Sequence, residues 1–137
     1  MDSGGKGMNI LIVEDDFVSR KFMTKFLSKY GVCQTAEDGE QAVKMYKDAA
    51  EQQRPYDFIC LDIVMPRMDG YKTLELIRNY EEGQGIASQE GVKVIMTTGM
   101  EVGTNITKAF ELGCVAYTSK PIDIVQFDSL LQQLQLI

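Results

Sequence analysis

The chain has no histidine and no tryptophan among its 137 residues, and it has only three prolines and three cysteines. Without histidine, the chain can form neither a Ser-His-Asp triad nor a histidine-based metal site. No apolar run approaches the roughly 20 residues that a membrane-spanning helix requires, and the first seven residues, MDSGGKG, lack the apolar segment of a signal peptide. We therefore expect a cytoplasmic protein that does not contact membranes.

The chain has 14 Lys and Arg residues but 20 Asp and Glu residues, so its net charge is -6. This charge repels the phosphate backbone of nucleic acids and anionic lipid, so neither is expected as a direct partner. The three cysteines, Cys33, Cys60 and Cys114, are far apart in the sequence and lie among apolar residues. That usage is typical of buried free thiols in a reducing compartment.

The length and the hydrophobic content of 45% indicate one domain with a single core. We expect residues 1–7 to be a flexible leader and residues 8–137 to form the domain. The leader does not read as a phosphate-binding loop, because Gly7 follows Lys6 where such loops carry Ser or Thr. The sequence ends at Ile137, directly after the last expected helix and without an output domain. It leaves open whether the domain works alone or was cut from a longer regulator.

Short apolar runs alternate with longer segments of helical periodicity along the chain. The runs and segments predict strands at residues 8–13, 32–36, 58–61, 92–96 and 115–119, and helices at 17–30, 40–53, 71–82, 105–112 and after Pro121. Connections of this length join parallel strands through right-handed crossovers. The expected fold is therefore a three-layer α/β sandwich with helices on both faces of the sheet.

Two finer expectations concern which segments are buried. In the first predicted helix, Phe22, Met23, Phe26, Leu27 and Tyr30 fall on one face and are expected to point inward. The segment EEGQGIASQEG at residues 81–91 is rich in Gly, Gln and Glu. It predicts a solvated surface loop, and contact with a partner stays open as the alternative.

Polar residues gather where the predicted strands end. These positions hold Glu14, Asp15 and Asp16, then Asp62, then Thr97 and Thr98, and finally Ser119 and Lys120. Because the carboxyl ends of parallel strands meet at one edge of a sheet, these side chains are expected to share one crevice. A single strand-end aspartate often only caps the next helix, so the prediction depends on the whole group.

Carboxylates that are brought together raise each other's pKa unless a cation lies among them. Lys120 supplies only one positive charge, and a divalent cation would complete the balance. Ligands that offer only oxygen favour Mg2+ over zinc or copper. A carboxylate beside Mg2+ can attack phosphorus, while a lysine and a hydroxyl neutralise the phosphoryl oxygens. The residues therefore fit the formation of an aspartyl phosphate at Asp62.

Four segments occur in an order that is similar to one family. They are LIVEDD at 11–16, LDIVMPRMDG at 61–70, IMTTG at 95–99 and AYTSKP at 116–121. Across residues 8–136 the chain strongly resembles the receiver domain of two-component response regulators. In this resemblance Arg20 sets the register, so that Glu14 and Asp15 match the family's acidic pair and Asp16 caps the following helix.

The resemblance implies a flavodoxin-like fold, with a five-stranded parallel sheet in the order 2-1-3-4-5. It implies that Asp62 is the phosphoacceptor. It also implies that Mg2+ is held by Asp15, by Asp62 and by the backbone carbonyl of Val64, with Glu14 acting through water.

Further positions take their expected roles from the same resemblance. Thr98 and Lys120 are expected to contact the phosphoryl group, Tyr117 to be the switch aromatic, and the bond from Lys120 to Pro121 to be cis. Val64 and Met100 are apolar at positions that modulate dephosphorylation in the family. Since neither side chain can orient a hydrolytic water, we expect a long-lived phosphoryl state.

The resemblance also implies the partners. A histidine kinase or a phosphotransfer protein would donate the phosphoryl group from its own histidine, because this chain has none. Phosphorylation would shift the domain between two conformations. Helix 4, strand 5 and helix 5 would form the face for a downstream protein or a homodimer. The domain would then be no enzyme, except toward its own phosphorylation and dephosphorylation.

Two other functions are weighed against this one. A phosphatase of the haloacid dehalogenase type also uses a strand-end aspartate and Mg2+, but it needs a second acid where this chain has Val64. A degenerate receiver that only binds a protein, without phosphorylation, is the stronger alternative. The retention of Asp15, Asp62, Thr98 and Lys120 counts against it.

Overall fold

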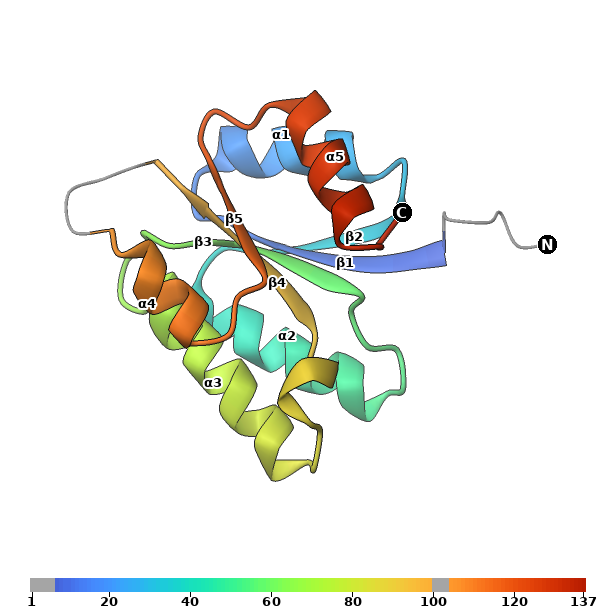
Figure 1. Ribbon diagram of the computed structural model, residues 1–137, viewed down its shortest axis with the longest axis vertical. Helices are drawn as coiled ribbons and strands as arrows, with labels where there is room; N and C mark the ends of the chain where they lie inside the picture. Colours follow the sequence, from blue (N-terminus) through green and yellow to red (C-terminus); the bar gives the residue numbers. More distant parts are fainter. Residues whose placement is uncertain (1–6, 100–103) are drawn as a thin grey trace.

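The computed structural model describes residues 7–99 and 104–137. Its centre is a parallel sheet of five strands, β1 (Met8–Val13), β2 (Gly31–Ala36), β3 (Phe58–Asp62), β4 (Lys93–Thr98) and β5 (Ala116–Ser119). The strands lie in the order β2-β1-β3-β4-β5, which confirms the expected topology (Figure 1). Most of the expected leader, residues 1–7, and all of Met100 lie outside the described ranges.

Helices cover both faces of the sheet. They are α1 (Phe17–Leu27), α2 (Gly39–Glu51), α3 (Gly70–Gly83), α4 (Ile106–Glu111) and α5 (Ile124–Gln133), with a short 3-10 helix, η2 (Ser88–Glu90), before β4. Helices α1 and α5 pack on one face, and α2, α3 and α4 pack on the other (Figure 1). The expected three-layer sandwich is confirmed.

Each of these five α-helices begins after an aspartate or an asparagine. The capping residues are Asp16, Asp38, Asp69, Asn105 and Asp123, and each side chain accepts a hydrogen bond from a backbone N–H in the first turn of its helix. Such caps satisfy backbone donors that have no partner within the helix, and each contributes about 1 kcal/mol. The expectation that Asp16 caps the first helix is therefore confirmed.

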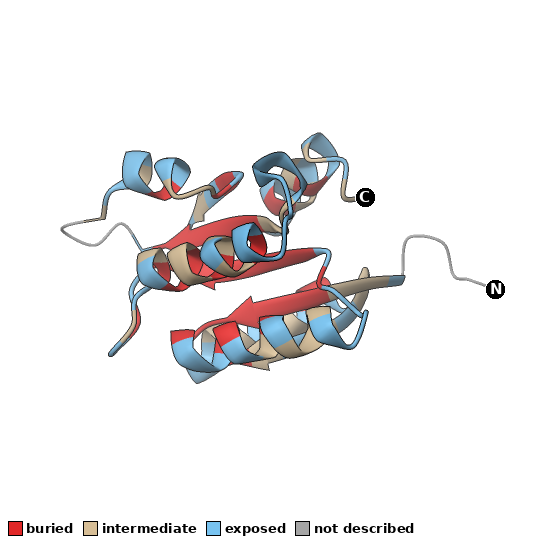
Figure 2. Ribbon diagram, turned by 90° about the horizontal axis from the view of Figure 1, so that it is seen from below, coloured by how far each residue is buried: buried red, intermediate tan, exposed pale blue. Residues whose placement is uncertain are grey.

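The core has two layers because side chains alternate across each strand. Leu11 and Leu61 point toward α2 and α3, whereas Ile12 and Cys60 point toward α1 and α5. Every residue of β3 is buried, as expected for a strand that is covered on both faces (Figure 2). This rigid central strand ends at Asp62.

Two burial expectations are wrong. Phe22 is 43% exposed, while Met23, Phe26 and Leu27 are buried. Phe22 lies at the margin of the buried stripe of α1, where its ring packs obliquely on Phe26. The periodicity of one helix gives the direction of its apolar stripe but not how wide a strip the neighbouring elements cover.

The second error concerns one end of residues 81–91, because residues 82–90 are exposed as expected. Residues 81–83 complete α3, residues 88–90 form η2, and Glu81 is only 3% exposed. The surface-loop expectation therefore fails at Glu81. The thiols of Cys33, Cys60 and Cys114 are free, as expected. Within the described residues, no helix combines the length and the apolar character that crossing a membrane requires.

Candidate functional site

The strand-end residues come together at one edge of the sheet. Glu14 and Asp15 follow β1, Asp62 ends β3, Thr98 ends β4, and Lys120 follows β5. The Lys120 Nζ atom lies 2.8 Å from Glu14 Oε1 and 3.1 Å from Asp62 Oδ2. One ammonium thus bridges carboxylates from two segments that are distant in the sequence.

Three of these residues form an acidic cluster. Glu14, Asp15 and Asp62 each offer one carboxylate oxygen, and these oxygens lie within 4.8 Å of one another. Glu14 and Asp62 are buried, whereas Asp15 is exposed. A cluster of hard oxygen ligands with one open side fits Mg2+, which keeps several waters when a protein binds it.

Charges within the cluster are strongly coupled. Burial, and after it the negative charge of Glu14, raise the pKa of Asp62 to about 7, while Lys120 opposes the rise. Burial by itself would lower the pKa of Lys120, but hydrogen bonding to Glu14 and attraction to Asp62 raise it overall. Lys120 therefore stays positively charged at neutral pH. Its single charge does not fully offset the effect of burial and of Glu14 on the ionised form of Asp62.

Backbone contacts position the two acidic segments. The Arg20 guanidinium donates to the backbone carbonyl oxygens of Glu14 and Asp15, at 2.9 and 3.4 Å. Gly70 N–H donates to Ile63 O at 2.8 Å, and a Cβ on Gly70 would lie 2.4 Å from the Asp62 carbonyl oxygen. Only glycine therefore allows the start of α3 to approach the end of β3 this closely.

In the turn after β3, Ile63 and Met65 are buried in the core, whereas Val64 and Arg67 face solvent. Val64 N–H donates to Asp62 Oδ1 at 3.3 Å, and its side chain is 46% exposed. Arg67 has a φ of 68° in this turn and binds Asp38 at 3.1 Å across the surface. The backbone of Val64 thus contacts the Asp62 carboxylate, and its half-exposed side chain contributes no polar group.

The remaining predicted residues lie on β4 and β5. Thr98 is fully buried, and its backbone oxygen accepts a hydrogen bond from Lys120 N at 2.7 Å. Tyr117 is 44% exposed, and its ring meets Phe110 of α4 edge-on, with 6.1 Å between centroids. The peptide bond between Lys120 and Pro121 is cis, as expected.

Comparison with protein families decides the assignment, because the model of the response regulator receiver domain matches residues 10–132. The chain belongs to this family. The match runs from the third residue of β1 to the last residue but one of α5. The receiver fold and the expected family are thereby confirmed.

Some relatives of this receiver domain are segments of much longer proteins. The probable histidine kinase 2 of Oryza sativa subsp. indica is 35% identical over 127 residues, which cover 85% of this chain but only 12% of the kinase. The chain thus spans about an eighth of that relative's length.

Two solved receiver domains are similar in structure and contain magnesium. One is the receiver domain of the histidine kinase CKI1 from Arabidopsis thaliana, complexed with Mg2+, with 27% identity, a TM-score of 0.78 and coverage of 94% of this chain and 92% of that one. The other belongs to the sensor histidine kinase PA1611 from Pseudomonas aeruginosa PAO1 and has a magnesium ion in its active-site cleft. It shows 30% identity, a TM-score of 0.73 and coverage of 93% and 96%.

Some contributors to this receiver site were missed by the sequence analysis. Phe110 was not singled out, although its ring holds the exposed Tyr117. Arg20 was used only to align the motif, whereas the structure has it holding the backbone of the acidic pair. The signal for Arg20 was its position one turn into α1, where a long side chain can reach back over the preceding loop.

Proposed function

We propose that this receiver domain accepts a phosphoryl group on Asp62 from a histidine of a partner kinase or phosphotransfer protein, in a reaction that depends on Mg2+. The observation that supports this most is the acidic cluster bridged by Lys120, where Asp62 faces both a cation and two further carboxylates. Solved relatives that hold magnesium support the choice of metal.

Different residues of the chain take different parts in the transfer of the phosphoryl group. An oxygen of the Asp62 carboxylate attacks phosphorus while the bond from phosphorus to the donor histidine nitrogen breaks, and the imidazole leaves with the bonding electrons. The Lys120 ammonium, 3.1 Å from Asp62 Oδ2, is placed to neutralise the oxygens of the incoming group. Mg2+ held by Asp15, Asp62 and the Val64 carbonyl, with Glu14 acting through water, would add further positive charge at those oxygens.

The phosphorylated domain then acts as a switch. Thr98 would bond a phosphoryl oxygen through its hydroxyl, and Tyr117 would turn inward from its exposed position. Such a change shifts a two-state population, because the phosphate has different contacts in the two states. The face formed by α4, β5 and α5, which carries Tyr117 and Phe110, would bind a downstream protein or a second copy. The domain would catalyse no reaction other than its own phosphorylation and dephosphorylation.

Labelling with acetyl phosphate in Mg2+ tests the proposal. We expect up to one phosphoryl group per chain in the wild type and none in Asp62→Ala, since the nucleophile is lost. Asp16→Asn is the matched control, because it removes a nearby acid but keeps the cap on α1, and it should label normally. Full labelling of Asp62→Ala would remove Asp62 from its role. Continuous release of phosphate would indicate a phosphatase, and no labelling of the wild type would indicate a degenerate binding module.

The lifetime of the phosphoryl group should depend on Val64. A half-exposed valine beside the acceptor offers no hydrogen bond to a hydrolytic water, so we expect slow decay in the wild type and severalfold faster decay in Val64→Asn. The measurement is loss of label after the donor is removed. Slower decay in Val64→Asn than in the wild type would contradict this reasoning. Met100, at the second modulating position, lies outside the described residues.

A further inference from the structure

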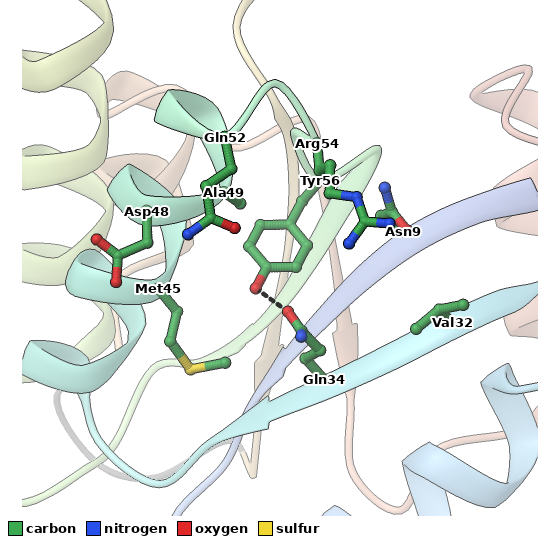
Figure 3. Close-up of a pocket in the computed structure, with 9 residues that line it drawn as sticks. All are labelled: Asn9, Val32, Gln34, Met45, Asp48, Ala49, Gln52, Arg54 and Tyr56. Atoms are coloured by element: carbon green, nitrogen blue, oxygen red, sulfur yellow. Dashed lines mark hydrogen bonds between the residues drawn. The ribbon is translucent and has the colours of Figure 1, made fainter.

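A second concave site lies at the other end of the sheet. A cavity of about 460 Å³ opens between α2 and the starts of β1, β2 and β3 (Figure 3). Asn9 and Val32 line it from the second positions of their strands, and Tyr56 lines it from just before β3. The acidic cluster is at the last residues of the strands, so this cavity is separate from it.

Polar side chains supply most of the lining of the cavity, and apolar side chains supply the rest. Val32, Met45, Ala49 and the ring of Tyr56 supply apolar surface. The Tyr56 hydroxyl donates to Gln34 Oε1, which fixes the ring in the middle of the cavity (Figure 3). The volume of the cavity falls in the range of about 300–1,000 Å³ that is usual for small-molecule sites.

The turn at the end of α2 places Arg54 at the edge of the cavity. Gln53 has a φ of 61°, Gln53 N donates to Ala50 O at 3.1 Å, and Arg54 N donates to Ala49 O at 2.9 Å. These two hydrogen bonds form a Schellman motif, which reverses the chain at a helix end. The motif gives Arg54 a defined backbone position at the cavity although its side chain is exposed.

The guanidinium of Arg54 makes no hydrogen bond or ion pair within residues 7–99 and 104–137. A shortage of acidic residues does not explain the unpaired guanidinium, since the chain has 20 acidic residues and 14 basic ones. The carboxylate that also lines the cavity, Asp48, is bound by Lys44 at 2.7 Å. Among the described residues that line the cavity, Arg54 is therefore the charged side chain without an ion-pair partner, and it lies next to the amide groups of Gln34 and Gln52.

We propose that this cavity binds a small organic carboxylate with a planar apolar body. The carboxylate pairs with the Arg54 guanidinium, whose parallel N–H groups match two carboxylate oxygens. The planar body rests against the polarisable thioether of Met45, a contact that favours aromatic rings, and it reaches only the small exposed edge of the otherwise buried Tyr56. Binding here leaves Asp62 and its cluster untouched, so the proposal stands apart from the phosphoacceptor function.

Phenylacetate is the probe, and its neutral isostere phenylacetamide is the control. In a titration followed by backbone amide NMR, phenylacetate should cause saturable shifts around Val32, Gln34, Ala49 and Arg54, with the amide binding at least about tenfold more weakly. Shifts of equal size and midpoint for both probes would overturn the role of the charge. Lack of saturable shifts with phenylacetate in the wild type would overturn the proposal as a whole.

Two variants test the assigned residues. Arg54→Gln, at an exposed position, should weaken phenylacetate binding at least about tenfold, whereas Arg67→Gln, an exposed arginine elsewhere, should not change it. Ala49→Leu should block the cavity while Arg54 is still present. Unchanged binding in Arg54→Gln or in Ala49→Leu would show that the probe binds somewhere else. Labelling of Asp62 by acetyl phosphate should be the same in Arg54→Gln and the wild type, which separates this test from that of the phosphoacceptor.

Discussion

Asp62 is the residue whose surroundings most constrain its chemistry. The apolar strand β3 carries it to the rim of the sheet, where it is 3% exposed. Burial and the charge of Glu14 raise its pKa to about 7, although Lys120 lies beside it. The ionised carboxylate is therefore an unfavourable state of the metal-free protein. A bound divalent cation would relieve this, because it favours the ionised form.

The pKa of Asp62 sets a pH dependence of stability without metal. Because its folded pKa of about 7 exceeds the ordinary value of 3.8, the folded protein binds more protons, and the contribution of this group to stability is lost as the pH rises from about 4 through 7. We expect Asp62→Asn in metal-free buffer at pH 8 to be about 1–2 kcal/mol more stable than the wild type, and about equally stable near pH 4. Urea unfolding followed by circular dichroism measures both.

Magnesium supplies the control for this prediction. Adding Mg2+ at pH 8 should stabilise the wild type and have little effect on Asp62→Asn, since a ligand that binds only the folded state raises stability by mass action. The variant and the wild type should then approach each other in free energy of unfolding. If Asp62→Asn were the less stable protein at pH 8 without metal, the assigned cause of the raised pKa would be wrong.

At the scale of elements, Glu81 ties the end of α3 to its neighbours. Its carboxylate accepts hydrogen bonds from Tyr46 Oη of α2 at 2.6 Å, Val92 N at 2.8 Å and Arg78 at 2.7 Å. Arg78 also donates to Gly113 O at 2.7 Å, in the turn before β5. Burial, and after it the bond to Glu81, raise the pKa of Tyr46. One buried carboxylate thus joins α2, α3 and the approaches to β4 and β5.

Removing this carboxylate should destabilise the protein strongly. In Glu81→Ala the buried Tyr46 hydroxyl and the Arg78 guanidinium lose their shared acceptor, and breaking such a buried pair costs about 3 kcal/mol. The neighbouring Glu82→Ala is the matched control, because Glu82 is exposed, and its effect should stay within about 0.5 kcal/mol. Chemical denaturation of both variants and of the wild type measures the loss in free energy of unfolding. Equal, small losses would mean that Glu81 is solvated after all.

At the scale of the whole molecule, the two ends of the sheet have different surroundings. The carboxyl ends carry the acidic cluster and lead to Thr98 and Tyr117, whereas the amino ends carry the cavity at Arg54. Tyr117 is half exposed and rests on Phe110 of α4. Any inward turn of this ring must break that contact, so the position of Tyr117 reports on the state of α4 and β5.

Phosphorylation should therefore protect Tyr117 from chemical modification. We expect nitration by tetranitromethane, mapped to individual peptides, to slow at Tyr117 when acetyl phosphate and Mg2+ are present, because the ring leaves the surface. Tyr30, in the turn between α1 and β2 and bonded to Asp128, is the internal reference and should react at the same rate in both states. Thr98→Ala should reduce the protection. Equal nitration of Tyr117 with and without acetyl phosphate would contradict the proposed inward turn.

The sequence by itself determined the order of elements along the chain and which strand-end side chains lie together at one edge of the sheet. Buried strands are short apolar runs and helices carry local periodicity and Asp or Asn caps, so both are visible in a single segment of chain. The site was predictable because in a parallel sheet the residues that follow each strand must meet at one edge. Glu14, Asp62 and Lys120 could be placed together before any distance was known.

Only the tertiary structure decided how deeply individual side chains are buried and what surrounds them. Phe22 was expected inside and is exposed, Glu81 was expected in solvent and is buried, and Arg54 gave no signal until the turn after α2 placed it at a cavity. The pKa of Asp62 likewise depends on its burial, on Glu14, which raises it further, and on Lys120, which opposes the rise, and both residues follow other strands. The burial of a side chain and the electrostatic field around it depend on many neighbours that are distant in the sequence. A local sequence pattern therefore cannot predict them.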